Sequence, residues 1–201
     1  MLKGYCGSCW AFSAVGVLEG LNFNHSGHLV SLSEQNLVDC STSKYGNEGC
    51  DGGLPASAIK YVIDNNGIDG EDDYPYEGVE GTCRYSRLYS KATASGIVRL
   101  PYGDEKKLAE AVATVGPISV GIDASGISTY KSGVYAPKHC SHRPNHAVLI
   151  VGYDGTKKRI PYWLIKNSWG TSWGDNGYMK LIRNNHNTCG VATMAVYATL
   201  H

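Results

Sequence analysis

The spacing of hydrophobic positions changes midway along this chain of 201 residues. In the first half, apolar residues recur at intervals of three and four positions, which is the spacing of one face of a helix. After Cys9 they fall at Trp10, Ala14, Val17, Leu18 and Leu21. This pattern predicts a helix that begins at Cys9 and buries one face.

Capping signals predict three further helices. The run Ser31–Glu34 has the capping-box pattern, Gly67 is a C-terminal signal, and Asp104 is a suitable N-cap before a helix that Gly116 and Pro117 end. The predicted helices are a short one that ends at Val38, one over 54–65 and one over 105–115.

After residue 116 the pattern changes to β-branched and aromatic runs bounded by Gly, Pro and Asn, which is typical of strands. The predicted strands are 118–122, 147–153, 162–166 and 178–182. We therefore predict an α+β chain, with a mainly helical domain over 1–95 and a mainly β domain over 96–201. The β domain is predicted to form an antiparallel sheet or barrel.

Charge and composition narrow the functional classes. The chain has 18 basic and 18 acidic residues and no formal net charge. Nucleic acids and anionic membranes usually select a basic patch, so a protein or peptide partner fits better. No apolar stretch approaches the roughly 20 residues that span a bilayer, and the segment Met1–Gly4 lacks the apolar region of a signal peptide. We expect a soluble chain that is either processed or truncated.

Seven cysteines in a chain of this size indicate an oxidising compartment. The odd number leaves one thiol unpaired, and the other six allow many pairings among which the residues alone do not choose. The sequon at Asn24 agrees with the secretory route and predicts a glycosylation site.

Three residues are candidates for nucleophilic chemistry. Cys9 opens a helix, where the helix dipole and the unsatisfied amides favour a thiolate. His146 begins the apolar run 146–153, and a strand end holds an imidazole more rigidly than a loop. Asn167 follows another predicted strand, and its side-chain carbonyl can accept the imidazole proton and fix the orientation of the ring. Trp169 is expected to shield that hydrogen bond from water.

Structural alternatives exist for each of these signals. Cys9 is an inert buried thiol in one alternative, and in another it forms a redox pair of thioredoxin type with Cys6, although that fold needs a strand before the motif. In further alternatives, Gly52 and Gly53 only form a turn, and Trp169 and Trp173 are only core residues. A zinc site is a last alternative, although the spacing fits no common ligand pattern, at His139, Cys140, His142 and His146.

The run Cys6–Ser13 resembles the active-site signature of the papain family of cysteine proteases. Further runs resemble the cathepsin L branch and extend the resemblance from Gly4 to Tyr197. They are Ser33–Gln35, Leu37–Cys40, Gly49–Gly53, His146–Tyr153 and Asn167–Gly174. The resemblance implies a papain-like fold of two lobes with the active-site cleft between them.

The resemblance also implies the activity of a cysteine endopeptidase that needs no cofactor or metal. Cys9 is the implied nucleophile, His146 the acid and base, and Asn167 the residue that orients His146. The thiolate attacks a peptide carbonyl, His146 protonates the leaving amine, and water hydrolyses the acyl-enzyme. The implied thiolate–imidazolium pair predicts activity at acidic pH.

The implied oxyanion hole departs from the family pattern. Family members combine the backbone N–H of Cys9 with a glutamine side chain, and Lys3 stands at the position of that glutamine. Loss of one such donor costs roughly 10²- to 10³-fold in turnover, although the ammonium group is an alternative donor. We therefore expect reduced turnover from this chain.

Disulfide pairing and subsites come from the same resemblance. The implied disulfides join Cys6 to Cys50, Cys40 to Cys83 and Cys140 to Cys189, which leaves Cys9 free. Gly52 and Gly53 are implied to pair with an extended peptide. Uncharged residues are implied to form the pocket for the side chain second from the scissile bond on the acyl side, so this pocket is expected to prefer hydrophobic side chains to arginine. The implied substrate-binding residues are Gly52, Gly53, Leu54, Pro55, Gly121, Pro144, Asn145, Ala147, Trp169 and Met194.

The resemblance finally implies the biological setting. Protein or peptide substrates, the chain's own propeptide and cystatin-type inhibitors are the implied partners of a monomer in a lysosomal, vacuolar or secreted location. Mature family chains begin more than a dozen residues upstream, so we expect a partial sequence or an artificial start. The rival hypothesis is a non-catalytic relative that keeps the fold and has lost turnover, which Lys3 favours and the intact Cys9, His146 and Asn167 oppose.

Overall fold

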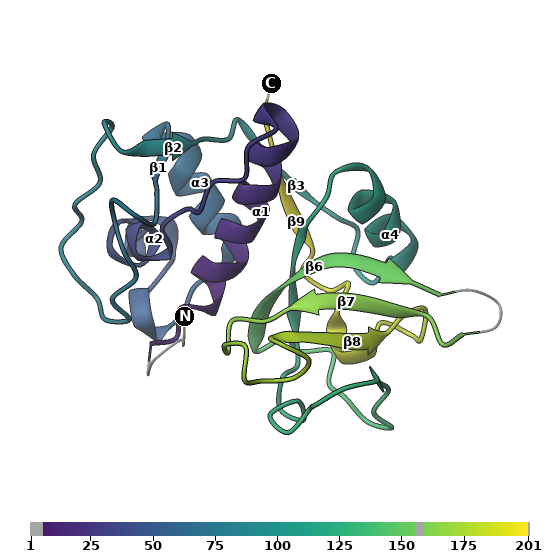
Figure 1. The fold of residues 1–201 in the computed structure, drawn as a ribbon. Coiled ribbons are helices and arrows are strands. Elements are labelled where there is room, and N and C mark those ends of the chain that lie inside the picture. The colour runs from purple at the N-terminus through teal and green to yellow at the C-terminus, as the bar shows by residue number, and fades with distance from the viewer. Residues whose placement is uncertain (1–5, 156–158, 201) are drawn as a thin grey trace. The chain divides into compact units, whose positions relative to one another are not determined.

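The computed structural model describes residues 6–155 and 159–200, which fold into two compact units (Figure 1). The helical unit contains residues 6–98 and 197–200, and the sheet unit contains residues 99–155 and 159–196. None of the described helices is both long and apolar enough to cross a membrane. The units are described separately below.

The helical unit is built around three helices, of which α1 packs against both others. Its core consists of side chains with almost no exposed surface, such as Trp10, Leu37 and Ile59. Two short strands pair antiparallel beside the helices. The elements are α1 (Cys9–Ser26), α2 (Glu34–Cys40), α3 (Pro55–Asn65), β1 (Ile68–Asp69) and β2 (Ser90–Ala92), with 3-10 turns η1 (Ser43–Tyr45) and η2 (Gly49–Asp51).

Helix α1 begins at Cys9 as predicted, but the prediction of a single buried face was wrong. Ala11 and Val15 lie outside the predicted apolar stripe and are buried, whereas Leu21 within that stripe is only half-buried. The small residues in this stretch let neighbouring elements approach the helix from several sides. Helix α1 ends at Gly27, which adopts a left-handed conformation (φ 75°) and donates its N–H to the carbonyl of Phe23.

The start of α2 differs from the predicted capping box. The N-cap is Ser33, whose side chain accepts a hydrogen bond from the backbone N–H of Asn36, and the helix continues to Cys40 rather than Val38. Ser31 is not the cap, because its carbonyl accepts the N–H of Glu71 and Leu32 forms a β-bridge with Gly70. Pairing with a segment distant in sequence therefore keeps residues 31 and 32 extended.

The sheet unit contains α4 (Glu105–Thr114) and most of a seven-stranded sheet with the order β3-β9-β4-β6-β7-β8-β5. The predicted cap holds, since Asp104 Oδ1 accepts the N–H of Lys107. Strands β4, β6, β7 and β8 pair antiparallel in turn, whereas β5 pairs parallel with β8. The strands are β3 (Gly96–Arg99), β4 (Ile118–Ile122), β5 (Val134–Tyr135), β6 (His146–Asp154), β7 (Tyr162–Lys166), β8 (Tyr178–Ile182) and β9 (Val196–Thr199).

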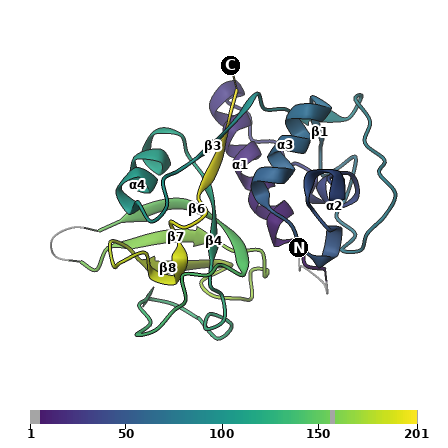
Figure 2. The same ribbon diagram turned by 180° about the vertical axis from the view of Figure 1, so that it is seen from behind.

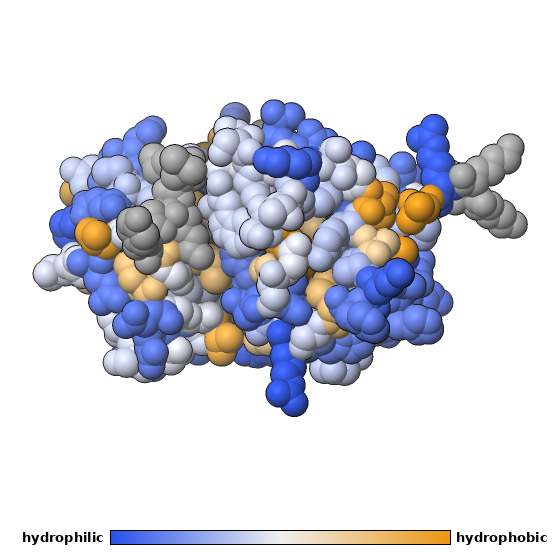
Figure 3. Space-filling model, turned by 90° about the horizontal axis from the view of Figure 1, so that it is seen from below, coloured by the Kyte–Doolittle hydropathy of each residue, from blue (hydrophilic) through white to orange (hydrophobic). Residues whose placement is uncertain are grey.

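Helix α4 lies beside β6, as the view from behind also shows (Figure 2). Its buried residues Leu108, Ala111 and Val112 lie on one face and contribute to the core of the sheet unit. That core is completed by fully buried side chains of the sheet, including Ile150 and Trp163. On the face drawn in Figure 3, hydrophobic residues lie among hydrophilic ones.

Three disulfides stabilise the described residues, and each lies within one unit. Cys6 is bonded to Cys50 and Cys40 to Cys83 in the helical unit, and Cys140 is bonded to Cys189 in the sheet unit. These are the pairs that the family resemblance implies. Bridges that close loops of this length typically contribute about 2–4 kcal/mol each. Cys9 is the free cysteine of the described chain.

Candidate active site

Cys9 is the first residue of α1 and is partly exposed. Ser8, which precedes it, makes no side-chain cap, and the first turn of this fully described helix contains no acidic residue. The hydroxyl of Ser8 instead forms a hydrogen bond of 2.6 Å with the hydroxyl of Tyr76. The positive end of the helix is therefore not neutralised by a side chain at this point, which favours an anion such as a thiolate.

The loop 49–53 fixes the start of α1 by close backbone contacts. The N–H of Gly7 donates to the carbonyl of Cys50 at 2.7 Å, and a Cβ at Gly7 would lie 2.4 Å from that same oxygen. The indole of Trp10 donates to the carbonyl of Gly49 at 3.0 Å. A Cβ at Gly53 would meet the Trp10 ring at 2.8 Å. Glycine is therefore required at positions 7 and 53, where the start of α1 and the loop meet. Cys9 lies between Gly7 and Trp10, the two residues that bind the loop.

His146 begins β6 and is held by the sheet. Its Cα lies opposite that of Ile122 on β4, and the residue is 7% exposed. The ring atom Nε2 lies 2.8 Å from Oδ1 of Asn167, which directly follows β7. The backbone N–H of Asn167 donates to the carbonyl of Gly177, so the position of this side chain is also fixed. The structure thus brings together two of the residues that the sequence singled out.

The hydrogen-bond pattern determines which ring nitrogen carries the proton towards Asn167. Oδ1 also accepts the backbone N–H of Ser168 at 2.8 Å, which requires an oxygen at that position of the amide. Nε2 of His146 must then donate, because both groups face the same acceptor. The other ring nitrogen, Nδ1, is the one that does not face Asn167.

One tryptophan stacks on the imidazole of His146, and a second tryptophan packs against the first. The ring of Trp169 stacks on His146 with centroids 4.9 Å apart, and Trp173 packs edge-on against Trp169 at 5.3 Å. The indole N–H of Trp173 donates to the carbonyl of Ile127, which anchors the second ring. Asn167 is 8% exposed. The shielding of the hydrogen bond by Trp169 stays a prediction, and the supporting contact of Trp173 was not predicted from the sequence.

The expected substrate-binding residues lie in both units. In the helical unit, Gly52, Gly53 and Leu54 lead directly into α3 at Pro55, and the Leu54 side chain is exposed.

In the sheet unit, Gly121 on β4 pairs with Ala147 on β6. A Cβ at Gly121 would lie 2.7 Å from Cβ of Pro144 and 3.7 Å from that of Met194. Four of the six expected residues of this unit, including the exposed Met194, therefore form one uncharged cluster.

Asn145, another expected substrate residue, has its side chain bonded within the sheet unit. Oδ1 accepts the backbone N–H of Ala124 at 2.8 Å, and Nδ2 donates to Oγ of Ser125 at 3.2 Å. The backbone N–H of Asn145 donates to the carbonyl of Ile122. The side chain thus connects the start of β6 to the loop after β4, a role that the sequence did not indicate.

Lys3 and Asn24 are the remaining residues with an expected role. Lys3, the expected side-chain donor of the oxyanion hole, lies outside the described residues. Asn24 is an exposed residue in the last turns of α1, where the Ser26 hydroxyl of its sequon donates to the carbonyl of Asn22.

The alternative readings of the other cysteines are not compatible with the disulfides. Cys6 is bonded to Cys50, so it is not available as the partner of Cys9 in a redox pair. Cys140 is bonded to Cys189 and has no free thiolate for zinc. Within the described ranges, no group of three or more potential ligands is placed to hold a metal ion.

Comparison with known proteins decides the family. The model of the papain family of cysteine proteases matches residues 2–199. The chain belongs to this papain family. Cathepsin L of Sarcophaga peregrina is 53% identical over 201 residues, which cover 98% of this chain and 59% of that protein. Cathepsin S of Bos taurus is 54% identical over 197 residues, with coverage of 97% and 59%.

Solved structures confirm the papain-like fold and the α+β class. Digestive procathepsin L 3 from the larval midgut of Tenebrio molitor superimposes with a TM-score of 0.94 at 47% identity, covering 99% of this chain and 65% of that one. Procathepsin L2 of the same tissue gives a TM-score of 0.93 at 45% identity. The cathepsin L-like resemblance is thereby confirmed. This papain-family chain spans about 59% of the length of the curated relatives described above.

Proposed function

We propose that this papain-family chain is a cysteine endopeptidase in which Cys9 is the nucleophile, His146 the acid and base, and Asn167 the orienting residue. The observation that carries the proposal is the hydrogen bond that holds His146 Nε2 against the oxygen of Asn167, and we assign proton transfer to the other ring nitrogen, Nδ1. The second support is Cys9, a free and partly exposed thiol at the N-terminus of a helix.

In the proposed reaction the Cys9 thiolate attacks the carbonyl carbon of a peptide bond. The backbone N–H of Cys9 and a donor at position 3 stabilise the oxyanion that forms. His146 then transfers its Nδ1 proton to the leaving amine, while its Nε2–H remains hydrogen-bonded to Asn167. The acyl-enzyme is hydrolysed by water, which His146 deprotonates as a base. The stacked ring of Trp169 limits the access of water to the orienting hydrogen bond.

The same proposal includes a preference for a hydrophobic side chain second from the scissile bond on the acyl side. Support comes from the uncharged cluster of Gly121, Pro144, Ala147 and Met194 in the sheet unit, with Leu54 and Pro55 as the proposed contribution of the helical unit. An arginine side chain would find no carboxylate among these residues and would lose hydration without compensation. Gly52 and Gly53 are proposed to bind the extended backbone of the substrate.

The setting of the enzyme is part of the proposal. Both solved structures described above are of procathepsins, which supports a propeptide as a partner that blocks the site before processing. Protein substrates, cystatin-type inhibitors, a monomeric state and a lysosomal, vacuolar or secreted location are proposed from family membership. Three disulfides and the exposed sequon at Asn24 are consistent with the secretory route.

Active-site titration with a peptidyl epoxide tests the proposal. Such a reagent requires a reactive thiolate next to a peptide-binding site, so we expect one label per chain, located on Cys9 by mass spectrometry. The variants Cys9→Ser and His146→Ala serve as controls, with no labelling and much slower labelling respectively. Labelling of Cys9 no faster than that of a small free thiol would instead identify a non-catalytic relative.

A further inference from the structure

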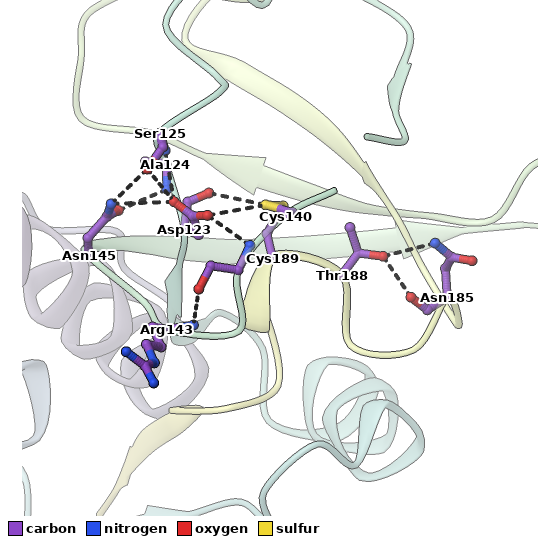
Figure 4. Close-up of a disulfide and its surroundings, with 10 residues drawn as sticks. Asp123, Ala124, Ser125, Cys140, Arg143, Asn145, Asn185, Thr188 and Cys189 are labelled. Carbon is purple, nitrogen blue, oxygen red and sulfur yellow. Dashed lines mark hydrogen bonds between the residues drawn. A yellow bond between two sulfur atoms is a disulfide. The ribbon is translucent and has the colours of Figure 1, made fainter. Parts of the chain in front are cut away.

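The carboxylate of Asp123 lies at the centre of a hydrogen-bond network next to the start of β6 (Figure 4). Asp123 directly follows β4 and is 8% exposed. Oδ1 accepts the N–H of Ser125 at 3.0 Å and its hydroxyl at 2.6 Å, and Oδ2 accepts the N–H of Ser141 at 2.9 Å. These hydrogen bonds lower the pKa of Asp123, with the Ser125 hydroxyl as the largest cause. The carboxylate is therefore held in its charged form.

The network also includes the disulfide of the sheet unit. Cys140 Sγ lies 3.7 Å from the backbone oxygen and from Oδ2 of Asp123, and the backbone N–H of Asp123 donates to the carbonyl of Cys189. A disulfide sulfur carries no hydrogen, so the two sulfur contacts are packing contacts rather than hydrogen bonds. Asp123 therefore connects both cysteines of the bridge to the loop after β4.

The connection from Asp123 to His146 passes through one residue. Asn145 Nδ2 lies 3.4 Å from Asp123 Oδ1 and 3.2 Å from Ser125 Oγ, while Asn145 Oδ1 accepts the N–H of Ala124. Asn145 is covalently followed by His146, whose Cα pairs with Ile122. The Asp123 carboxylate thus adds two hydrogen bonds, from Ser141 and Asn145, between the segments 123–125 and 141–145 on either side of that pair.

We propose that Asp123 is a positioning residue that sets the orientation of the His146 imidazole by holding Asn145 and the segment before β6. The inference rests on the proposed function of His146 and deepens it. Movement of the segment before β6 shifts the backbone of His146 relative to Asn167, because Asn167 follows β7 and does not move with that segment. The Nε2–Oδ1 hydrogen bond then weakens, and Nδ1 leaves the direction in which it transfers a proton.

A carboxylate is needed because four donors converge on its two oxygens. In Asp123→Asn one oxygen becomes an NH₂ group, which would face either the N–H of Ser141 or the N–H and hydroxyl of Ser125. A donor that faces another donor loses its hydrogen bond, so the contact of residue 123 with one of the two segments is weakened. The substitution conserves shape, which makes it a specific test of the acceptor pattern.

The experiment compares Asp123→Asn with the matched variant Asp39→Asn. Asp39 is a similarly buried carboxylate, 5% exposed, which accepts Gln35 Nε2, the N–H of Gly81 and the Tyr74 hydroxyl in the helical unit. Both variants are expected to unfold at lower temperature. With concentrations normalised to the folded fraction, we expect kcat for a fluorogenic peptide to fall roughly 10-fold in Asp123→Asn at little changed KM, since a displacement of 1 Å can cost about 10²-fold. Asp39→Asn is expected to keep the kcat of the unmodified chain.

A second measurement does not depend on turnover. Proton NMR of the histidine rings is expected to show a slowly exchanging Nε2–H signal for His146, assigned by its loss in Asn167→Ala. In Asp123→Asn this proton is expected to exchange with water at least about 10-fold faster, whereas Asp39→Asn is expected to leave it unchanged.

The outcomes separate the inference from the proposed function. An inactive unmodified chain would contradict the proposed function, and the NMR comparison would still test the positioning. Equal kcat values and equal exchange rates in Asp123→Asn and Asp39→Asn would overturn the positioning role. Equal losses in both variants would also overturn it, because a general loss of stability would then account for the effect.

Discussion

Oδ1 of Asn167 accepts two hydrogen bonds, one from the imidazole of His146 and one from a backbone N–H. The backbone donor is the N–H of Ser168, and its hydrogen bond determines which atom of the Asn167 amide faces His146. The other amide atom, Nδ2, is buried and has no hydrogen-bond partner in the described part of the chain. The Asn167 side chain is thus oriented by the hydrogen bonds to its oxygen, and its NH₂ group makes no compensating hydrogen bond with the described residues.

We therefore expect Asn167→Ala to lower kcat by roughly 10- to 100-fold, a part of the 10²- to 10⁴-fold that acid–base catalysis contributes. KM is expected to change little, because the side chain faces the imidazole rather than the peptide. Asn167→Asp keeps an acceptor for both donors and is expected to lose less activity than the alanine variant. Steady-state kinetics on active-site-titrated enzyme measures both values. Equal losses in the two variants would show that the acceptor is not the important feature.

The buried carboxylate of Glu105 predicts a large effect on stability. It accepts the indole N–H of Trp163 and the backbone N–H groups of Asn184 and Asn187, at 3.0, 2.7 and 2.9 Å. Glu105→Ala leaves these three donors without a partner and is expected to lower the free energy of unfolding by about 3–5 kcal/mol. Urea denaturation monitored by tryptophan fluorescence checks the value.

Glu110→Ala is the control for that measurement, because this residue lies on the same helix and pairs with Lys107 at the surface. Exposed ion pairs contribute little, so the control is expected to change stability by about 0.5 kcal/mol or less. A Glu105→Ala variant as stable as Glu110→Ala would mean that water satisfies the three donors.

Local signals account for much of the fold. Strands β4, β7 and β8 have the predicted bounds, and α4 begins after Asp104, because capping and apolar runs act over a few neighbouring residues. The strands β1, β2, β3, β5 and β9 were not predicted. Each has two to four residues, and its pairing partner lies far away in the sequence. The same cause explains Ser31, where pairing of its neighbour Leu32 with Gly70 overrides a local capping pattern.

The candidate site also contains residues that the sequence predicted and residues that it did not. His146 and Asn167 were identified from motifs at strand ends, and the structure joins them. The Asp123 network escaped prediction because two of its four donors are backbone N–H groups, which every residue type except proline carries. No side-chain pattern marks such a network in the sequence.

Lys3 gives a prediction that addresses the expected oxyanion hole. A glutamine at this position supplies a side-chain N–H donor to the oxyanion, and one such donor contributes roughly 10²- to 10³-fold. Lys3→Gln is therefore expected to raise kcat, by about 10-fold or more, at similar KM. Lys60→Gln is the control, because Lys60 is exposed on α3 and pairs with Asp64. No gain from Lys3→Gln would show that the ammonium group already acts as donor.

The buried carboxyl of Asp69 predicts an unusual dependence of stability on pH. Burial is the largest cause of a raised pKa, above the ordinary value of 3.8, and Oδ1 has no hydrogen-bond partner among the described residues. Asp73 raises and Lys91 lowers this pKa to a smaller extent, and Oδ2 accepts the N–H of Ser86. A raised pKa in the folded state contributes stability below pH 3.8 that is lost as the pH rises through the folded value. Asp69→Asn removes this loss.

We compare the Tm of Asp69→Asn with that of the unmodified chain at each pH. The difference, variant minus unmodified chain, is expected to increase by about 2 °C or more from pH 3 to pH 7. Asp123→Asn gives the opposite sign, because the folded pKa of Asp123 is lowered and its contribution is present above pH 3.8 and lost as the pH falls. The Tm deficit of Asp123→Asn is thus expected to be largest at pH 7 and to shrink towards pH 3. Calorimetry of both variants at several pH values tests the pair, and parallel curves for the two would contradict the assignment of opposite shifts.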